Sequence, residues 1–248
     1  MTDIMPGAEP MSVNGGPTGV LAIHGFTGSP QSMRPIASAM AAAGHSVELP
    51  LLPGHGTTVD DMLATGWSDW TAAVDAAYRD LAARTERVVV TGLSMGGALT
   101  LWLATQHPEI AAIIPINAAG KADPDLMEGL QAFIDSGATV IDAIGGDIAK
   151  DGVVEVAYDQ TPLAPLLSLQ QGILDMSGEF SKIAMPTLLI TSRNDHVVSP
   201  DTSDFIAEQI GSDPERLWLD DSFHVATLDH DAQRIIDAVA SMIADLDV

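Results

Sequence analysis

A serine flanked by glycines, between two apolar runs, is the feature of this sequence that most constrains its fold. Residues 92–96 read Gly-Leu-Ser-Met-Gly, after a valine run at 88–90 and before an apolar run at 98–103. A buried strand, a tight turn and a buried helix are the context in which G-x-S-x-G forms a nucleophile elbow. The glycines would make room for the turn and leave the Ser94 hydroxyl exposed. The alternative is a glycine-rich turn with a solvated serine.

Apolar segments of two periodicities alternate along the chain. Branched and aliphatic runs predict strands at residues 19–23, 46–49, 88–91, 111–116, 187–191 and 217–219. Apolar residues at helical spacing predict helices at 67–83 and 231–246, and Trp67, Trp70 and Trp102 lie on such stripes, as core residues do. This alternation predicts an α/β fold, with a mostly parallel central sheet and helices on both faces.

Residues 118–183 interrupt the alternation. They contain adjacent glycines at 145–146, several prolines and an amphipathic stretch at 126–134. An insertion at the carboxyl ends of parallel strands would cover the place where Ser94 points. We therefore expect 1–117 and 184–248 to form the core and 118–183 to form a cap. Two ordinary crossover helices with a loose linker are the alternative.

The composition argues against several classes of partner. The chain carries 34 acidic residues against 10 lysines and arginines, for a net charge of −24. Such a surface repels phosphate and anionic lipid, so we expect no nucleic-acid partner and at most transient membrane contact through the cap.

The absence of cysteine excludes disulfides and Cys-ligated zinc, and we expect no metal or cofactor. No signal peptide or transmembrane segment is recognisable, which predicts a cytoplasmic protein.

Ser94 would need a general base, oriented by a carboxylate, to act as a nucleophile at neutral pH. In the fold that carries the elbow, the acid and then the histidine follow the serine along the chain. Asp195 follows the predicted strand at 187–191, and His224 follows the last predicted strand. We expect these two as acid and base, with His230 as the alternative base.

Other histidines and acids have more ordinary explanations. His107 ends the helix that follows the elbow, so it should lie about three turns from the serine. His196 is expected to be a loop residue and not a metal ligand. Three acids near the expected base, most of them expected to be solvated or to cap a helix, are Asp220, Asp221 and Asp229.

A tetrahedral intermediate formed on Ser94 would also need amide donors for its oxyanion. The Met95 amide, directly after the serine, is one expected donor. The Phe26 amide, in the glycine-containing loop after the first predicted strand, is the other. His24 is expected to support that loop and not to act as a second base.

Taken together, the motifs resemble those of bacterial monoacylglycerol lipases, which are α/β-hydrolases related to small carboxylesterases. The matching stretches are HGFTG at 24–28, SMRP at 32–35, PGHGT at 53–57, GLSMGG at 92–97, PINAA at 115–119, DHVV at 195–198 and HVATLD at 224–229. The resemblance implies Ser94, Asp195 and His224 as nucleophile, acid and base, with the Phe26 and Met95 amides as oxyanion donors.

The resemblance also implies an activity and two cap residues. Glu155 would bind the glycerol hydroxyls, although a solvent-facing residue of a helical turn is the alternative, and Ile144 would shape the acyl and glycerol region. The implied reaction hydrolyses a lipid ester, a monoacylglycerol, to glycerol and a fatty acid through an acyl-enzyme. The alternatives are a general carboxylesterase and a hydrolase-fold binding protein with negligible turnover. Residues 120–143 depart most from the family pattern, which leaves the acyl-chain preference open.

Overall fold

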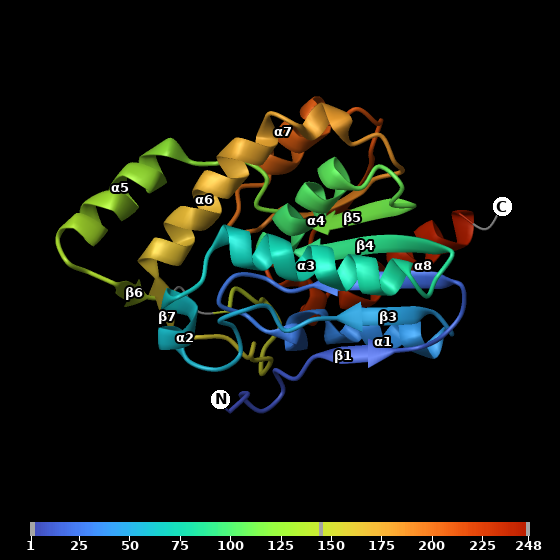
Figure 1. Cartoon of the computed structure of the whole chain (residues 1–248), viewed down its shortest axis with the longest axis horizontal. Coiled ribbons are helices and arrows are strands. Elements are labelled where there is room, and N and C mark those ends of the chain that lie inside the picture. The colour runs from blue at the N-terminus through green and yellow to red at the C-terminus, as the bar shows by residue number, and fades with distance from the viewer. Residues whose placement is uncertain (1–2, 144–145, 247–248) are drawn as a thin grey trace.

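A mostly parallel sheet forms the centre of the computed structural model, which describes residues 3–143 and 146–246 (Figure 1). Across the described residues the strand order is β1-β3-β2-β4-β5-β8-β9. Their bounds are Met11–Val13 (β1), Thr18–Ile23 (β2), Ser46–Leu49 (β3), Arg87–Leu93 (β4), Ala112–Ile116 (β5), Leu188–Ser192 (β8) and Glu215–Leu219 (β9). All neighbouring pairs are parallel except β1 with β3. The predicted α/β architecture is confirmed.

The six strands expected from the sequence are all present, with ends that differ by a few residues. β1 was not predicted. It is a short edge strand, Met-Ser-Val, whose three residues pair antiparallel with β3. Three residues are too few to show a strand periodicity, so this pairing is visible only in the fold.

Helices cover both faces of the sheet (Figure 1). One face packs α1 (Arg34–Ala42) and α8 (Ala232–Asp245), and the other packs α3 (Trp67–Ala82), α4 (Met95–Gln106) and α7 (Asp201–Gln209). Alternate β4 residues enter the two cores: Val89 joins the α1 side, while Val88 and Val90 join the α3 side. The three tryptophans belong to the core, as expected. Trp70 is fully buried, and the partly buried Trp67 and Trp102 pack against the core cluster that contains it.

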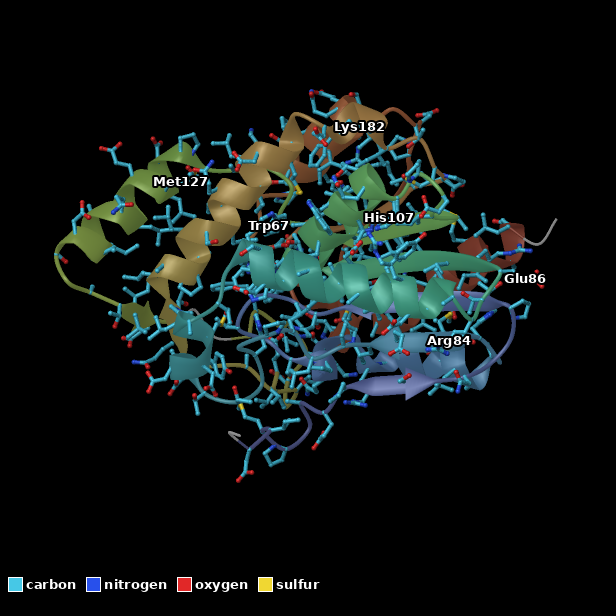
Figure 2. All side chains as sticks on the ribbon, viewed as in Figure 1. Trp67, Arg84, Glu86, His107, Met127 and Lys182 are labelled. Carbon is cyan, nitrogen blue, oxygen red and sulfur yellow. The ribbon has the colours of Figure 1, made fainter. Side chains whose placement is uncertain are left out.

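The segment between β5 and β8 contains two helices and a separate strand pair. The bounds are Pro124–Asp135 (α5), Val140–Asp142 (β6), Gln160–Pro162 (β7) and Leu163–Ser177 (α6). β6 and β7 pair antiparallel outside the central sheet. α6 packs against α5 on one side and against α3 and α4 on the other, so Met127 of α5 and Trp67 of α3 lie on opposite sides of it (Figure 2).

The remaining elements are short. α2 (Val59–Leu63) lies against β7 and α6, and 3₁₀ turns occupy Pro30–Met33, Phe180–Lys182 and Ala226–Leu228. None of the helices described in 3–143 and 146–246 combines the length and the apolar character needed to cross a membrane.

Candidate active site

Ser94 occupies a strained turn between β4 and α4. Its φ of 57° and ψ of −115° lie in a region that non-glycine residues rarely adopt. The turn is held by hydrogen bonds: Ser94 N–H donates to Ile116 O at 2.9 Å, and Ser94 O accepts from Ala119 N–H at 3.1 Å. Such strain persists only where the surroundings enforce it, and it is typical of functional sites. The structure therefore has the elbow geometry that the sequence predicts.

The two elbow glycines are required by close backbone approach. A Cβ at Gly92 would lie 2.2 Å from Gly96 O, and a Cβ at Gly96 would lie 2.1 Å from Ile23 O. Both distances are far below van der Waals contact, and the obstacles are backbone atoms that cannot rotate away. Only glycine lets α4 begin this close to the ends of β2 and β4.

Asp195 and His224 are in direct contact. Asp195 Oδ2 lies 2.7 Å from His224 Nδ1, and Asp195 Oδ1 accepts the Val197 and Val198 N–H groups, each at 2.8 Å. The side chains are 1% and 8% exposed. Because an ionised carboxylate only accepts hydrogen bonds, Nδ1 carries the proton and the Nε2 lone pair is free to act as a base.

Asn117, at the end of β5, joins the loops that carry these residues. Its Oδ1 accepts Ser192 N–H at 2.7 Å, and its Nδ2 donates to His224 O at 2.7 Å. The preceding residue, Ile116, accepts Ser94 N–H. The ends of β4, β5, β8 and β9 are thus connected at one edge of the sheet. The sequence indicated Asn117 only as part of the PINAA motif and did not predict this connecting role.

Among the described residues no hydrogen bond joins Ser94 Oγ to His224 Nε2. Bonds between a nucleophile and its base commonly tighten only in the substrate complex. The structure shows Asp195 in contact with His224, and Ser94 at the same edge of the sheet.

The HGFTG loop, residues 24–28, lies beside the elbow. A Cβ placed on Gly25 would be 3.5 Å from Ser94 Cβ. Buried His24 donates from Nδ1 to Gly25 O at 3.0 Å and accepts Leu52 N–H at Nε2 at 3.1 Å. Gly25 C=O and Phe26 N–H belong to one peptide plane, so the first bond fixes the direction of the Phe26 N–H. Met95 N–H belongs to the first turn of α4, where helix amides lack intrahelical partners.

Glu155 lies against this loop. Its Oε1 is 2.9 Å from the position that a Cβ would take on Gly28. Burial raises the pKa of the Glu155 carboxyl, an effect that the nearby His224 charge partly opposes. In the part of the chain that the structure describes, no hydrogen bond reaches the carboxylate. Glu155 is therefore packed near the acid–base pair. Ile144 falls outside the described residues.

Two other acids play roles that the sequence did not suggest. Asp229 was grouped with acids expected to be mostly solvated, yet it is 1% exposed. Its carboxylate accepts the N–H groups of Ala149, Lys150, Phe223 and His230. Asp147 accepts hydrogen bonds from the loops that contain Asp195 and His224. The bonds from Ala149 to Asp229 and from His196 to Asp147 span 80 and 49 positions, so no local sequence pattern marks either acid.

The remaining histidines lie apart from the acid–base pair or point elsewhere. His107 follows α4 (Figure 2). It contacts Asp75 Oδ1 at 2.6 Å and Glu109 Oε1 at 3.0 Å. His196 is 58% exposed, and His230 is exposed just before α8. Within residues 3–143 and 146–246, no group of three histidines and acids is arranged to hold a metal ion.

Comparison with known families decides the classification. The model of the family described as serine aminopeptidase, S33, matches residues 18–231. The chain belongs to this family. This α/β-hydrolase is 44% identical to a thermostable monoacylglycerol lipase of Bacillus sp. (strain H-257), over 94% of its own length and 93% of the relative. It is 28% identical to a carboxylesterase of Bacillus subtilis (strain 168), over 96% and 97% of the two chains.

Solved structures give the same classification. The first is a structure reported for LipS and LipT, two metagenome-derived lipolytic enzymes. It has a TM-score of 0.94 and 46% identity, and the match covers 98% of this hydrolase and 100% of that chain. The monoacylglycerol lipase of Paleococcus ferrophilus has a TM-score of 0.78 at 15% identity, over 96% and 99% of the two chains. The latter likeness concerns the fold alone.

The buried histidines behind the HGFTG loop predict acid sensitivity for this hydrolase. Burial lowers the pKa of His24 to about 4 and that of His55 to about 3. Below about pH 6.5 the unfolded chain therefore binds protons that the folded chain does not, so the free energy of unfolding falls as the pH falls from about 6.5 to about 4. Each such group contributes a slope of about 1.4 kcal/mol per pH unit.

Urea denaturation at several pH values checks this prediction. His55→Asn keeps a donor for Pro53 O, which the imidazole now contacts at 3.0 Å, and is expected to show a shallower slope. His230 is exposed, so His230→Asn is the control. Its free energy of unfolding should depend on pH as that of the parent does. A slope in His55→Asn equal to that of the parent would contradict the prediction.

Proposed function

We propose that the protein is a monoacylglycerol lipase that uses Ser94, His224 and Asp195. The enzyme is a carboxylic ester hydrolase, and a relative of nearly the same length, 44% identical, is a monoacylglycerol lipase. The observation that carries the proposal is the 2.7 Å contact between Asp195 and His224 at the sheet edge where Ser94 occupies a strained elbow. That pair supplies the base that a serine hydroxyl needs.

The proposed reaction follows the chemistry of a serine esterase. His224, oriented by Asp195, removes the proton of Ser94 Oγ as the oxygen attacks the ester carbonyl. The amides of Phe26 and Met95 donate to the oxyanion. The tetrahedral intermediate then collapses, the alcohol leaves with a proton from His224, and an acyl-enzyme remains. Water, deprotonated by His224, attacks the acyl carbonyl, and Ser94 leaves with its proton restored.

We further propose that residues 118–183 form a cap over this site and that the rest of the chain forms the core. The β6–β7 pair outside the central sheet supports this division. The segment before β7 is bound to the core near the HGFTG loop: Tyr158 N–H donates to Thr27 O at 3.0 Å, and the Gln31 side chain binds Val154 O and Val156 N–H. These bonds bracket Glu155 and hold it beside the site.

Glu155 is proposed to read the alcohol part of the substrate. An ionised carboxylate has two acceptor oxygens and can receive both free hydroxyls of a monoacylglycerol, which a simple alkyl ester lacks. A buried acceptor left without donors is costly, so such a site discriminates strongly against substrates without hydroxyls. Its position against Gly28, close to His224, supports this role.

A comparison of two esters with the same acyl chain tests the role of Glu155. Glu155→Ala is expected to lower kcat/KM for the monoacylglycerol about 10- to 100-fold, because one charged hydrogen-bond acceptor is worth about 1.5–3 kcal/mol. Its kcat/KM for the ethyl ester should change little. Glu128→Ala removes an exposed acid of α5 and serves as the control. Equal losses on both esters would exclude glycerol recognition and favour a general carboxylesterase, the activity of the 28% identical relative.

A further inference from the structure

Asp147 connects the segment after β6 to both loops of the acid–base pair. Its Oδ2 accepts the backbone N–H of His224 at 3.0 Å and that of His196 at 3.1 Å. Its Oδ1 accepts from His196 Nδ1 at 2.9 Å, and its backbone O accepts Val225 N–H at 3.0 Å. One residue thus holds the residue after Asp195, His224 itself and the residue after His224.

The Asp147 carboxyl is suited to hold these amides. Its side chain is 11% exposed, so the bonds are shielded from water. Burial by itself would raise the pKa of Asp147, but the hydrogen bonds from His196 and His224 lower it below the usual value. The group therefore remains an ionised acceptor at neutral pH, and hydrogen bonds to an ionised acceptor are shorter and stronger than neutral ones.

A second buried carboxylate, that of Asp229, also joins these segments. Asp229 Oδ2 accepts Ala149 N–H at 2.7 Å and Phe223 N–H at 2.9 Å, while its Oδ1 accepts Lys150 N–H at 2.9 Å. Asp147 therefore reaches from the segment into the loops, and Asp229 reaches from the core back to the segment. Residues 147–150 and the His224 loop are fixed to each other by both carboxylates.

We propose that Asp147 is a positioning residue that sets the imidazole of His224 against Asp195 and toward Ser94. The inference rests on the triad of the proposed function. The imidazole direction depends on the His224 backbone, and the carboxylate of Asp147 fixes that backbone directly. A displacement of about 1 Å in a catalytic group can cost about 100-fold in rate. Because Asp147 belongs to the segment between β6 and β7, the placement of that segment and the alignment of the base are coupled.

The test compares Asp147→Ala, Asp147→Asn and the control Asp151→Ala on 4-nitrophenyl butyrate. Alanine removes both amide contacts, whereas asparagine keeps one oxygen that can accept both, as Oδ2 does now. Asp151 is an exposed acid four positions away, so its removal matches the charge change. If alanine prevents folding, Asp147→Ser replaces it, because its shorter side chain cannot reach both amides.

We expect kcat of Asp147→Ala to fall about 10- to 100-fold with KM within about twofold of the parent. Asp147→Asn is expected to retain kcat within about threefold, and Asp151→Ala should match the parent. The low-field proton resonance of the His224–Asp195 bond should shift or broaden in Asp147→Ala. A role in fold stability alone would change neither this resonance nor the kcat of the folded fraction.

Parent-like kcat in Asp147→Ala would overturn the proposal, as would a raised KM with unchanged kcat, which would place Asp147 in substrate binding. An equal loss in the asparagine variant would overturn the role assigned to the amide contacts. The test ester contains no glycerol, so failure of the monoacylglycerol assignment leaves this comparison intact. Failure of the triad itself would show separately, as full activity in Ser94→Ala.

Discussion

Replacing Ser94 with alanine is expected to lower kcat for ester hydrolysis by about four to six orders of magnitude, as in other serine hydrolases whose nucleophile is removed. Without Oγ no acyl-enzyme can form, and the Asp195–His224 pair has no hydroxyl to deprotonate. Ester hydrolysis by Ser94→Ala, measured with enough enzyme to detect the residual rate, checks this. The same serine should be the site of covalent labelling by a fluorophosphonate, identified by mass spectrometry.

Two histidine variants serve as a matched pair for this prediction. His224→Ala should lose activity on the scale of Ser94→Ala, because residues of a triad act as a unit and their losses do not add. His230→Ala should remain active, because that side chain is exposed just before α8. If His224→Ala were fully active and His230→Ala were inactive, His230 would be the base, and the triad would be contradicted. Full activity in Ser94→Ala would place the nucleophile elsewhere.

The geometry of the elbow and the contact between Asp195 and His224 could be predicted from the sequence because their signals are local. Gly92, Ser94 and Gly96 lie within five residues between two apolar runs, and both glycines proved to be required by backbone contacts. Asp195 and His224 each follow a strand with a clear apolar pattern, and parallel strands bring such loops to one edge of a sheet. The contact between the two residues follows from that topology.

The supports of the site could not be predicted, because they depend on contacts between distant segments. Asp147 binds amides 49 and 77 positions away, and Asp229 binds amides 79 and 80 positions away. Asp229 looked like a solvated loop acid because nothing near it in the sequence shows that the loop is buried. The backbone N–H groups that these acids bind occur at nearly every residue, so no pattern of side chains marks them.

Glu155, in the segment between β6 and β7, shows the same limit. Sequence alone left it between a glycerol ligand and a solvent-facing residue, because its apolar neighbours fit either interpretation. The hydrogen bonds of Gln31 to Val154 and Val156 place it beside Gly28. These bonds span more than 120 positions, and glutamine is common on protein surfaces, so the pairing has no sequence signal.

Gly96→Ala is expected to be the most destabilising single-methyl change in the elbow. The added Cβ would lie 2.1 Å from Ile23 O and 2.7 Å from His24 O, both backbone atoms. Relief requires β2 and α4 to separate, which would displace the HGFTG loop and Ser94 together. We expect a loss of more than about 4 kcal/mol in the free energy of unfolding, in the range seen for severe core disruption. Urea denaturation of the purified variant, or its failure to fold, measures this.

Gly129→Ala is the matched control, because a Cβ there meets nothing within 4 Å. Gly129 lies inside α5 and is exposed, so alanine should stabilise the protein by about 0.5–1 kcal/mol through the lower conformational entropy of the unfolded chain. The two variants add the same methyl group and differ only in what surrounds it. A Gly96→Ala protein with parent-like stability would show that the ends of β2 and α4 can separate at little cost. The strained conformation of Ser94 would then not be enforced by its surroundings, and the geometric basis for the elbow would be lost.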